Sequence, residues 1–473
     1  MKRAKRLSAL LILLVVVCAA AIAVMQMEER QEQIEATGEI VLEIDSEAVT
    51  SLSWEYADTS LAFHKDGTWL YDEDAAFPVD QEKIGELLAP FEAFGVSFVI
   101  EEVSDFGMYG LDDPVCTISL STADQDYTIT LGDFSELDEE RYVSIGDGNV
   151  YLAKSDPLEA YDTVLSDLID QDESLAYDRV STIRFSGTAD YSISYAEDSP
   201  DAWFSDDVYF TEDSGETVPL DTDLVESYLE NLTTLHLTDY VTYNVTEEEL
   251  SSYGLDQPEL SVEVDYTWTN ADSESVSGTY VLSISRDAEQ LAAAQAAEEA
   301  GEEPEAVTAY VRVGDSQIVY RVSEDTCEAL LAGSYDDLRH REVLRADFDT
   351  VTALDITLDG STYTIATDGS EDENGNRIWT YGETEVDFSD LRSTLEAMGA
   401  DSAEDFTPED TSGQEEIRLT ARLSGETRPE TEIILYRYNG SDCLAEVDGE
   451  EFALVSREAV VDLIEAVYAI VLE

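Results

Sequence analysis

Histidine, cysteine and basic residues are all scarce in this chain. Its 473 residues include 3 histidines, 4 cysteines and 24 lysines and arginines, against 108 aspartates and glutamates. Proteins bind nucleic acid through clustered lysine and arginine, because these side chains neutralise phosphates. A formal net charge of −84 therefore excludes nucleic acid as a partner. It disfavours anionic lipid surfaces and anionic wall polymers for the same reason.

The few cysteines form no motif. Beyond Cys18 they are Cys116, Cys327 and Cys443, an odd number without a CxxC pair or regular spacing. This pattern excludes a disulfide framework and a zinc site built from paired cysteines. Each of the three lies within an apolar pattern, so we expect buried thiols that act as small hydrophobic residues.

The three histidines lie far apart in the sequence. They are His64, His236 and His340, and none has a partner at metal-ligand spacing. We expect His64 at the surface or in a turn. His340 stands between Arg339 and Arg341, which favours a local ion pair or a helix C-terminal role. Since no nucleophile elbow, phosphate loop or HExxH helix is present, the sequence predicts a non-enzymatic protein without catalytic, cofactor-binding or metal-binding residues.

Acidic residues are so numerous that chance pairs of carboxylates carry little information. Glycoside cleavage needs two acids at the correct separation, so a carboxylate-dependent hydrolase stays an alternative function. Residues 368–376 resemble a calcium loop, but Tyr381 stands where the bidentate glutamate is required. We expect a polar hairpin tip there. The acidity itself suggests another alternative, a binding module for calcium or a cationic peptide.

The long apolar run of the sequence lies at the N-terminus. A basic cluster within residues 2–6 precedes an uncharged run over 7–25. As a helix this run would be about 28 Å long, close to the ~30 Å thickness of the hydrocarbon core. We expect residues 1–27 to form an N-terminal membrane anchor or signal segment, with the bulk of the chain extracytoplasmic. Cleavage at 21–23 and lipidation of Cys18 are the alternatives to a retained transmembrane helix.

One hexapeptide occurs twice. Residues 109–114 read Tyr-Gly-Leu-Asp-Asp-Pro and residues 253–258 read Tyr-Gly-Leu-Asp-Gln-Pro. A glycine just past a short helix takes the left-handed conformation, and the leucine after it then contacts an apolar residue one turn back. The predicted contacts are Leu111 with Phe106 and Leu255 with Leu250; the predicted N-terminal caps are Ser104 and a capping box at 246–249. The alternative is that Asp112 and Asp256 belong to a ligand or metal site.

A longer pattern recurs three times. It opens with strand-like residues at Val49, Val180 and Val351, and alternating residues then lead to Trp69, Trp203 and Trp379. An aspartate follows, with apolar residues four, seven and eight positions later, as on one face of a capped helix. These sets are Asp80 with Ile84, Leu87 and Leu88; Asp221 with Val225, Tyr228 and Leu229; and Asp387 with Leu391, Thr394 and Leu395. Only Thr394 departs from the apolar pattern.

Each copy is expected to end with strands, a tight turn and a helix. The strands are predicted at 115–120, 127–131, 260–266, 280–285, 417–423 and 431–438, and the turns at 146–148, 314–315 and 448–449. The predicted caps of the last helices are Ser155, Ser323 and Ser456. Their predicted apolar faces are Leu158, Tyr161, Leu165 and Leu168 in the first copy, and Val460, Val461, Ile464, Val467 and Tyr468 in the last.

These patterns predict an α+β fold of three tandem related domains, each an antiparallel sheet with helices packed on one face. The predicted boundaries are 28–47 for a charged stalk and 48–175, 176–346 and 347–473 for the domains. The third domain is divergent because it lacks the hexapeptide. Residues 287–306 are an alanine-rich and acidic insertion in the second domain, expected to be an exposed helical or disordered excursion. A partner-binding arm is its functional alternative.

The short N-terminal anchor, the Tyr-Gly-Leu-Asp-x-Pro motif and the tryptophan-containing opening hairpin together resemble a bacterial family, domain of unknown function 4340. The resemblance covers most of residues 49–345 and, more weakly, the third copy. It implies an envelope-exposed protein associated with ABC-type transporters and gliding-motility-like auxiliary proteins. We therefore expect a membrane-anchored, extracytoplasmic scaffold or accessory protein of an envelope complex. The resemblance supplies no catalytic residues.

Overall fold

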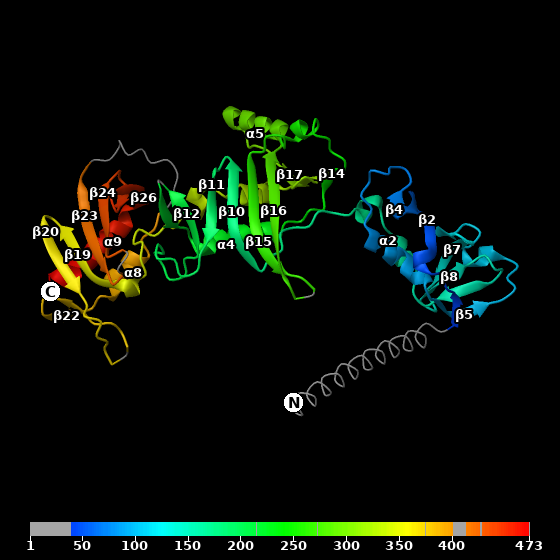
Figure 1. Cartoon of the computed structure of the whole chain (residues 1–473), viewed down its shortest axis with the longest axis horizontal. Helices are drawn as coiled ribbons and strands as arrows, with labels where there is room; N and C mark the ends of the chain where they lie inside the picture. The colour runs from blue at the N-terminus through cyan, green and yellow to red at the C-terminus, as the bar shows by residue number, and fades with distance from the viewer. Residues whose placement is uncertain are drawn as a thin grey trace, which may run out of the picture. The chain divides into compact units, whose positions relative to one another are not determined.

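The computed structural model describes residues 39–213, 215–271, 273–373, 375–400, 413–425 and 428–472. These residues form three antiparallel sheets accompanied by helices, and strands predominate (Figure 1). The chain divides into two compact units, residues 1–171 and 172–473. The first unit contains one sheet and the second contains two.

The first sheet has the strand order β1-β5-β9-β8-β7-β6-β2-β3-β4. Its strands are β1 (Glu39–Leu42), β2 (Val49–Tyr56), β3 (Thr59–Asp66), β4 (Thr68–Tyr71), β5 (Phe94–Ile100), β6 (Cys116–Thr122), β7 (Asp126–Ser135), β8 (Glu140–Ser144) and β9 (Val150–Ala153). Its helices are η1 (Ser46–Ala48), α2 (Gln81–Leu88), η2 (Ala89–Phe91), η3 (Phe106–Tyr109), α3 (Leu158–Tyr161) and η4 (Leu165–Leu168). Trp54 stacks on Phe63 and meets Tyr161 edge-on, and these rings fill the centre of the core.

The second sheet has the order β13-β12-β11-β10-β15-β16-β17-β18-β14. Its strands are β10 (Arg179–Gly187), β11 (Tyr191–Tyr195), β12 (Tyr209–Asp213), β13 (Glu216–Pro219), β14 (Tyr240–Thr242), β15 (Leu260–Thr269), β16 (Ser275–Arg286), β17 (Ala309–Val313) and β18 (Val319–Val322). Its helices are α4 (Thr222–Thr233), η5 (Leu250–Tyr253), α5 (Ala288–Ala300), α6 (Glu324–Leu331) and α7 (Tyr335–Leu338). Burial alternates along β15, so one side of the sheet faces the core.

The third sheet has the order β22-β21-β20-β19-β23-β24-β25-β26. Its strands are β19 (Val351–Leu358), β20 (Ser361–Ala366), β21 (Trp379–Tyr381), β22 (Thr384–Val386), β23 (Glu415–Leu423), β24 (Glu430–Arg437), β25 (Asp442–Val447) and β26 (Glu450–Ser456). Its helices are η6 (Phe348–Thr350), α8 (Ser389–Glu396) and α9 (Arg457–Val471). The two α-helices pack on each other, and α9 also packs on β25 and β26.

The opening strands share one irregularity. Pairing shifts by one residue after Val49 in β2, after Val180 in β10 and after Val351 in β19. In each bulge the hydroxyl of the next residue, Thr50, Ser181 or Thr352, donates to a carbonyl of the neighbouring strand. The extra residue explains why Val49 and Leu52 are both buried although they are three positions apart, since a regular strand would point them to opposite faces.

The hexapeptide forms the predicted helix stop in both copies. Gly110 and Gly254 are left-handed, with φ 71° and 70°. The N–H of Leu111 donates to Phe106 O (3.1 Å), and the N–H of Leu255 donates to the equivalent carbonyl in its loop (3.0 Å). This is the Schellman pattern. The predicted cap Ser104 is wrong, because the Asp105 side chain accepts the Gly107 N–H instead.

Asp80 and Asp221 cap α2 and α4 as predicted, and the apolar residues predicted for the faces of these helices are buried. The third prediction is one residue out of place. Phe388 is the N-cap of α8, although Asp387 still accepts the Ser389 N–H at 3.1 Å. A carboxylate one position before the cap can reach the first free N–H of the helix.

The closing helices differ from the prediction in two copies. Ser323 and Ser456 cap α6 and α9 as expected. The prediction of Ser155 is wrong, because α3 begins later and Asp156 accepts the Leu158 N–H. The single helix predicted through Leu168 is instead the two short helices α3 and η4. In α9 the buried residues are Val460, Leu463, Val467 and Ile470, so the face is rotated from the predicted one and Val461 is exposed.

Trp203 does not match the other two tryptophans. Trp69 and Trp379 lie buried in the equivalent strands β4 and β21. Trp203 lies in the loop between β11 and β12, and Tyr209 and Phe210 occupy the strand. The predicted equivalence is therefore wrong in the second copy, where the tryptophan lies outside the strand and stacks on Arg345 instead.

Other predicted features occur where expected. The insertion contains α5, which has no buried residues and lies at one end of the strands of the second sheet (Figure 1). Cys116, Cys327 and Cys443 are free and buried. The predicted anchor at 1–27 lies outside the described residues. Within the residues that are described, no helix is both long and apolar enough to cross a membrane.

Candidate functional site

Residues 339–346 connect the second sheet to the third, and their backbone pairs with the segment that follows α8. Ala400 donates its N–H to Arg341 O (2.7 Å), and Val343 donates to Met398 O (3.0 Å). Val343 is also buried in the core of the third sheet. The connection is therefore built into the fold, which fixes the positions of its polar side chains.

His340 is buried within this connection and faces carboxylates on two sides. Its Nε2 lies 2.8 Å from Asp207 Oδ1, and its Nδ1 lies 3.4 Å from Glu342 Oε2. The side chain of Asp207 is 1% exposed, and its second oxygen accepts the N–H groups of Trp203 and Phe204 at 2.8 and 2.9 Å. Asp207 is thus held rigidly by the loop before β12.

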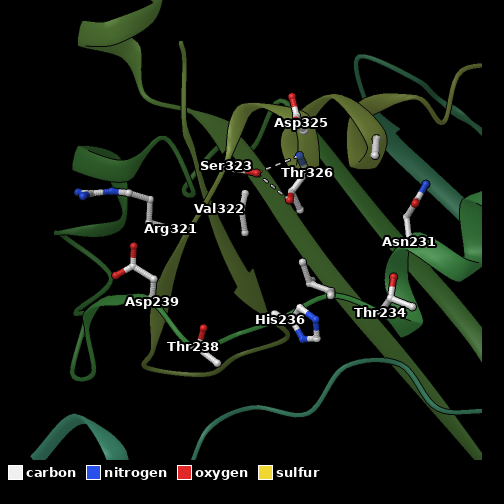
Figure 2. Close-up of a pocket in the computed structure, with 12 residues that line it drawn as sticks. Asn231, Thr234, His236, Thr238, Asp239, Arg321, Val322, Ser323, Asp325 and Thr326 are labelled. Carbon is white, nitrogen blue, oxygen red and sulfur yellow. Dashed lines mark hydrogen bonds between the residues drawn. The ribbon is translucent and has the colours of Figure 1, made fainter.

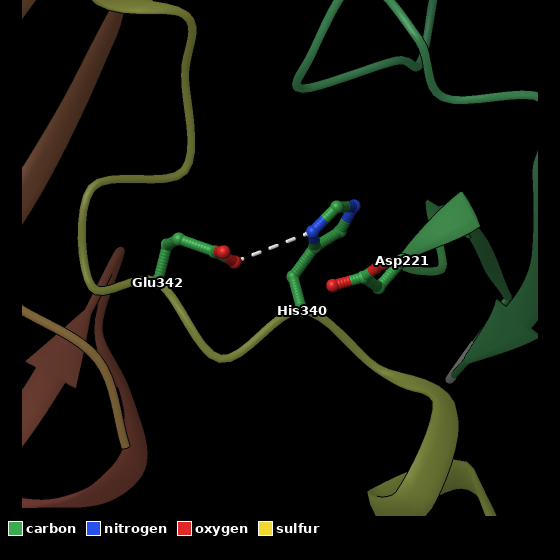
Figure 3. Close-up of side chains that lie close together, drawn as sticks. All are labelled: Asp221, His340 and Glu342. Carbon is green, nitrogen blue, oxygen red and sulfur yellow. Dashed lines mark ion pairs between the residues drawn. The ribbon is translucent and has the colours of Figure 1, made fainter. Parts of the chain in front are cut away.

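Asp221 completes a group of three possible ligands around the ring (Figure 3). One oxygen atom from each of Asp221 and Glu342 and one ring nitrogen of His340 lie within 4.8 Å of one another. Asp221 reaches this position because it is the N-cap of α4, and its backbone N–H donates to Leu338 O at 3.0 Å. Residues distant in sequence meet here because the connection crosses the start of the helix.

The imidazole of His340 and the carboxylate of Glu342 each favour the charged form of the other. Burial lowers the pKa of His340, but hydrogen bonds to Asp207 and Glu342 outweigh that effect and raise the pKa to about 9. The same bond to His340 lowers the pKa of Glu342. At neutral pH in the metal-free chain the ring is therefore an imidazolium between carboxylates. This fits the local ion pair expected for His340, although the expectation did not include Asp207.

Arginines and aromatic rings alternate beside the histidine. Arg345 lies between Trp203 and Phe452, with its guanidinium 4.6 and 4.5 Å from the two ring centres. Arg428 covers Trp203 from 5.2 Å, and Arg339 covers Phe452 from 4.5 Å. Such stacks hold a cation over the electron-rich face of a ring. Because Trp203 comes from the second sheet and Phe452 from the third, the stack joins these two sheets.

The other two histidines have separate settings. His64 lies exposed in β3, and its Nδ1 is 2.6 Å from Asp72 Oδ1. This agrees with the expected surface position. His236 lines an open pocket of about 360 Å³ between the end of α4 and the start of α6 (Figure 2). Arg321 and Asp239 line the same pocket, while Ser323 is engaged in capping α6.

A larger cavity of about 840 Å³ lies at the end of the third sheet. Its acidic lining residues are Asp349, Glu371, Asp372, Glu385 and Asp387, and its basic lining residues are Arg377 and Arg392. The described residues of the segment 368–376 lie between the antiparallel strands β20 and β21, where the sequence predicts a polar hairpin tip. Arg377 donates to Val351 O and Asp349 O, which anchors the tip to the opening strand.

The buried thiols are poor nucleophiles. Burial raises the pKa of Cys116 to about 12 and the pKa values of Cys327 and Cys443 to about 11. A thiol reacts as the thiolate, so each of the three is held in its unreactive form at neutral pH. Asp112 and Asp256, the alternative ligand residues of the hexapeptide, are exposed and belong to no metal-ligand group found among the described residues.

Sequence reasoning missed most of the group around His340. The spacing His340-x-Glu342 is a weak local signal for two ligands on one extended segment. Asp221 was assigned only as a helix cap, and nothing in the sequence links Asp207 to a histidine 133 positions later. That pairing is a product of the tertiary fold.

Comparison with known proteins gives a match to one family model, in two overlapping regions of the chain. The family described as Domain of unknown function (DUF4340) matches residues 69–258 and again residues 211–421. Each match begins in or next to the third strand of a sheet, β4 in one case and β12 in the other. No curated protein and no solved structure matches the chain. Since the two matches together cover more than half of its length, the chain belongs to the DUF4340 family.

Proposed function

We propose that this protein is a membrane-anchored, extracytoplasmic scaffold or accessory protein of an envelope complex, associated with an ABC-type transporter. The observation that carries the proposal is the repetition of one architecture. The central strands have the same order in all three sheets. Each opening strand also has the same bulge, in which a hydroxyl group donates to the neighbouring strand. Repeated domains in one chain create an extended surface, which is suited to holding partners at fixed spacing.

The three sheets are then three tandem related α+β domains, at 48–175, 176–346 and 347–473, except that the first begins by Glu39, inside the predicted stalk, because β1 pairs with β5. The equivalent helices α2, α4 and α8 follow β4, β13 and β22, the last strands of the opening run in each domain. The closing helices α3, α6 and α9 follow the last hairpin. Two of the domains also share the hexapeptide stop. The stacked arginines at 339–346 would keep the second and third domains in one orientation, which is useful in a spacer.

The anchor is proposed from residues 1–27 and from the charge of the remainder. An acidic surface remains detached from anionic lipid and wall polymers. It therefore leaves the domains exposed to a protein partner rather than adsorbed on the membrane. The raised pKa values of the three buried thiols also support a protein without nucleophilic cysteine chemistry.

Location can be tested on the full chain in a bacterial host. Leu137 is 91% exposed, so Leu137→Cys places a reactive thiol at the surface, while the native buried thiols provide a low background. A membrane-impermeant maleimide should label this variant in intact cells. Leu472→Cys, at 73% exposure, is the matched variant at the C-terminal end of α9, the helix that packs on the third sheet. Labelling of both only after lysis would contradict the extracytoplasmic location.

Partner binding needs a separate measurement. Crosslinking in native membranes, followed by purification of the tagged full chain, should recover an integral transporter subunit at a fixed ratio. Recovery of the chain alone, from cells in which the maleimide test has succeeded, would contradict the accessory function while leaving the location intact.

A cation-binding module is the second candidate function. The favouring observation is the acidic lining of the 840 Å³ cavity in the third sheet. Two arginines in the same lining offset part of its charge, so we rank it below the scaffold. Calorimetry of the full chain with Ca²⁺ and with a polycationic peptide at low salt should give no saturable heat if the scaffold proposal alone is correct.

A further inference from the structure

We propose that Asp221, His340 and Glu342 bind a divalent transition-metal ion, for which Zn²⁺ is the best match. The proposal goes beyond the scaffold function and does not depend on it. It rests on the arrangement of these three side chains and of Asp207 behind them.

The ligand atoms are already gathered. Donor atoms of the three residues lie within 4.8 Å of one another, so movements of about an ångström would place each within the ~2.0–2.2 Å of a zinc ion. Asp221 is fixed by the start of α4, with Oδ1 accepting the Leu224 N–H at 3.1 Å. Its other oxygen is not used in that cap.

Asp207 orients the imidazole for this purpose. It accepts a hydrogen bond from the Nε2–H group, at 2.8 Å, and is itself held by two backbone N–H groups. Metal-binding histidines usually donate their second ring N–H to such a carboxylate, which fixes the ring and the tautomer. Nδ1 is then the nitrogen that faces Glu342 and would bind the metal.

The site is also reachable. The Glu342 side chain is 41% exposed, whereas those of His340 and Asp207 are 7% and 1% exposed. An ion can therefore approach from the Glu342 side and meet a fixed histidine behind it. Three protein ligands leave a fourth tetrahedral position for water or for a group from another molecule.

The ligand set selects the metal. Imidazole nitrogen with carboxylate oxygen suits Zn²⁺ and related transition metals, while Ca²⁺ and Mg²⁺ prefer oxygen alone. The charge of −84 raises the local concentration of all cations. Of the two flanking arginines, Arg339 is engaged by Asp336 at 2.8 Å and by the Phe452 ring, so its charge is partly compensated.

The test is a Zn²⁺ titration of the full chain against a chromophoric chelator. The titration is carried out in physiological salt with excess Mg²⁺ and Ca²⁺, so that these ions occupy the surface carboxylates. We expect the unmodified chain to bind one equivalent of Zn²⁺ tightly. Asp207→Asn should keep this stoichiometry but lower the Zn²⁺ affinity by about 10–100-fold, as for other residues that orient a ligand. His340→Gln and Glu342→Gln should lose the tight equivalent. The matched control is His64→Gln, which removes an exposed histidine with its own carboxylate partner and should bind as the unmodified chain does.

A second measurement does not depend on whether the variants fold. Absorption spectroscopy of the unmodified chain with one equivalent of Co²⁺ should show a nitrogen ligand and a four- or five-coordinate spectrum. An all-oxygen, six-coordinate environment would overturn the proposal and identify binding to surface carboxylates. Tight binding that survives in His340→Gln would overturn it as well.

Discussion

The two hexapeptide loops share a sequence and a backbone turn but rest on different surfaces. In both, a left-handed glycine ends the short helix, and the preceding tyrosine packs on a second tyrosine, Tyr142 or Tyr310, at about 5 Å. A Cβ on Gly110 would lie 2.8 Å from the backbone N of Asp133, whereas one on Gly254 would lie 3.1 Å from Ser285 Cβ. The turn is set by local sequence, but its fit is set by the strand beneath it.

The largest expected difference follows from those two contacts. Gly110→Ala should lower the free energy of unfolding of the first unit by roughly 3 kcal/mol, from left-handed strain plus overlap with the β7 backbone. Gly254→Ala should cost roughly 1–2 kcal/mol, mainly from strain. Both losses in the free energy of unfolding can be measured by denaturant titration, with hydrogen exchange followed separately in each unit. Equal losses would show that the supporting strand does not distinguish the loops.

The second loop depends on a buried serine that has no counterpart in the first. Ser285 donates to Gly254 O (2.9 Å) and accepts the Glu259 N–H (3.1 Å). Ser285→Ala should cost about 1–2 kcal/mol, because it removes the hydrogen bonds of a half-buried carbonyl and a half-buried N–H. Hydrogen exchange should rise at Glu259 and in η5. Exchange confined to other regions would contradict this assignment.

The two units should also differ at alkaline pH. Burial raises the pKa of Cys116 to about 12, compared with about 11 for Cys327 and Cys443, from an ordinary value of 9.0. Because the folded pKa values are raised, the stability is full below pH 9 and falls as pH rises, by roughly 1.4 kcal/mol per pH unit for each thiol. The loss should continue to about pH 12 in the first unit and end near pH 11 for the thiols of the second. Cys116→Ala should remove part of the slope in the first unit alone; an unchanged slope there would assign it to buried tyrosines.

The smallest difference concerns the start of each short helix. The Asp105 side chain accepts the Gly107 N–H, whereas in the second loop Glu249 accepts from the N–H and the hydroxyl of Thr246. Asp105→Ala should cost about 1 kcal/mol, as for other N-caps. Glu249→Ala should cost less, since it leaves the hydrogen bond from the Glu249 N–H to Thr246 O in place. Comparing the denaturation midpoints of the two variants measures the difference, and a larger loss for Glu249→Ala would reverse the ranking.

Periodic features of this chain could be predicted from sequence. The helices after Asp80 and Asp221 were found because burial on a helix repeats every three to four residues. The opening of each sheet, Val-x-x-Leu in the first and third and Val-x-x-Ile in the second, carries more information than a strand alone. Its odd spacing records the bulge, since two core residues three apart need one extra residue between them. The split of the first closing helix was not visible, because Leu158 to Leu168 keeps a helical spacing across a break.

The sequence by itself determined the helix stops, the turns and the three recurring sets of core residues, because each depends on neighbours within a few positions. Only the tertiary structure decided which strand supports each loop, that Trp203 leaves its strand to stack on Arg345, and that Asp207 and Asp221 meet His340. The contacts of Trp203 and His340 join segments more than one hundred residues apart. All of these partners are chosen by the packing of sheets rather than by any local preference.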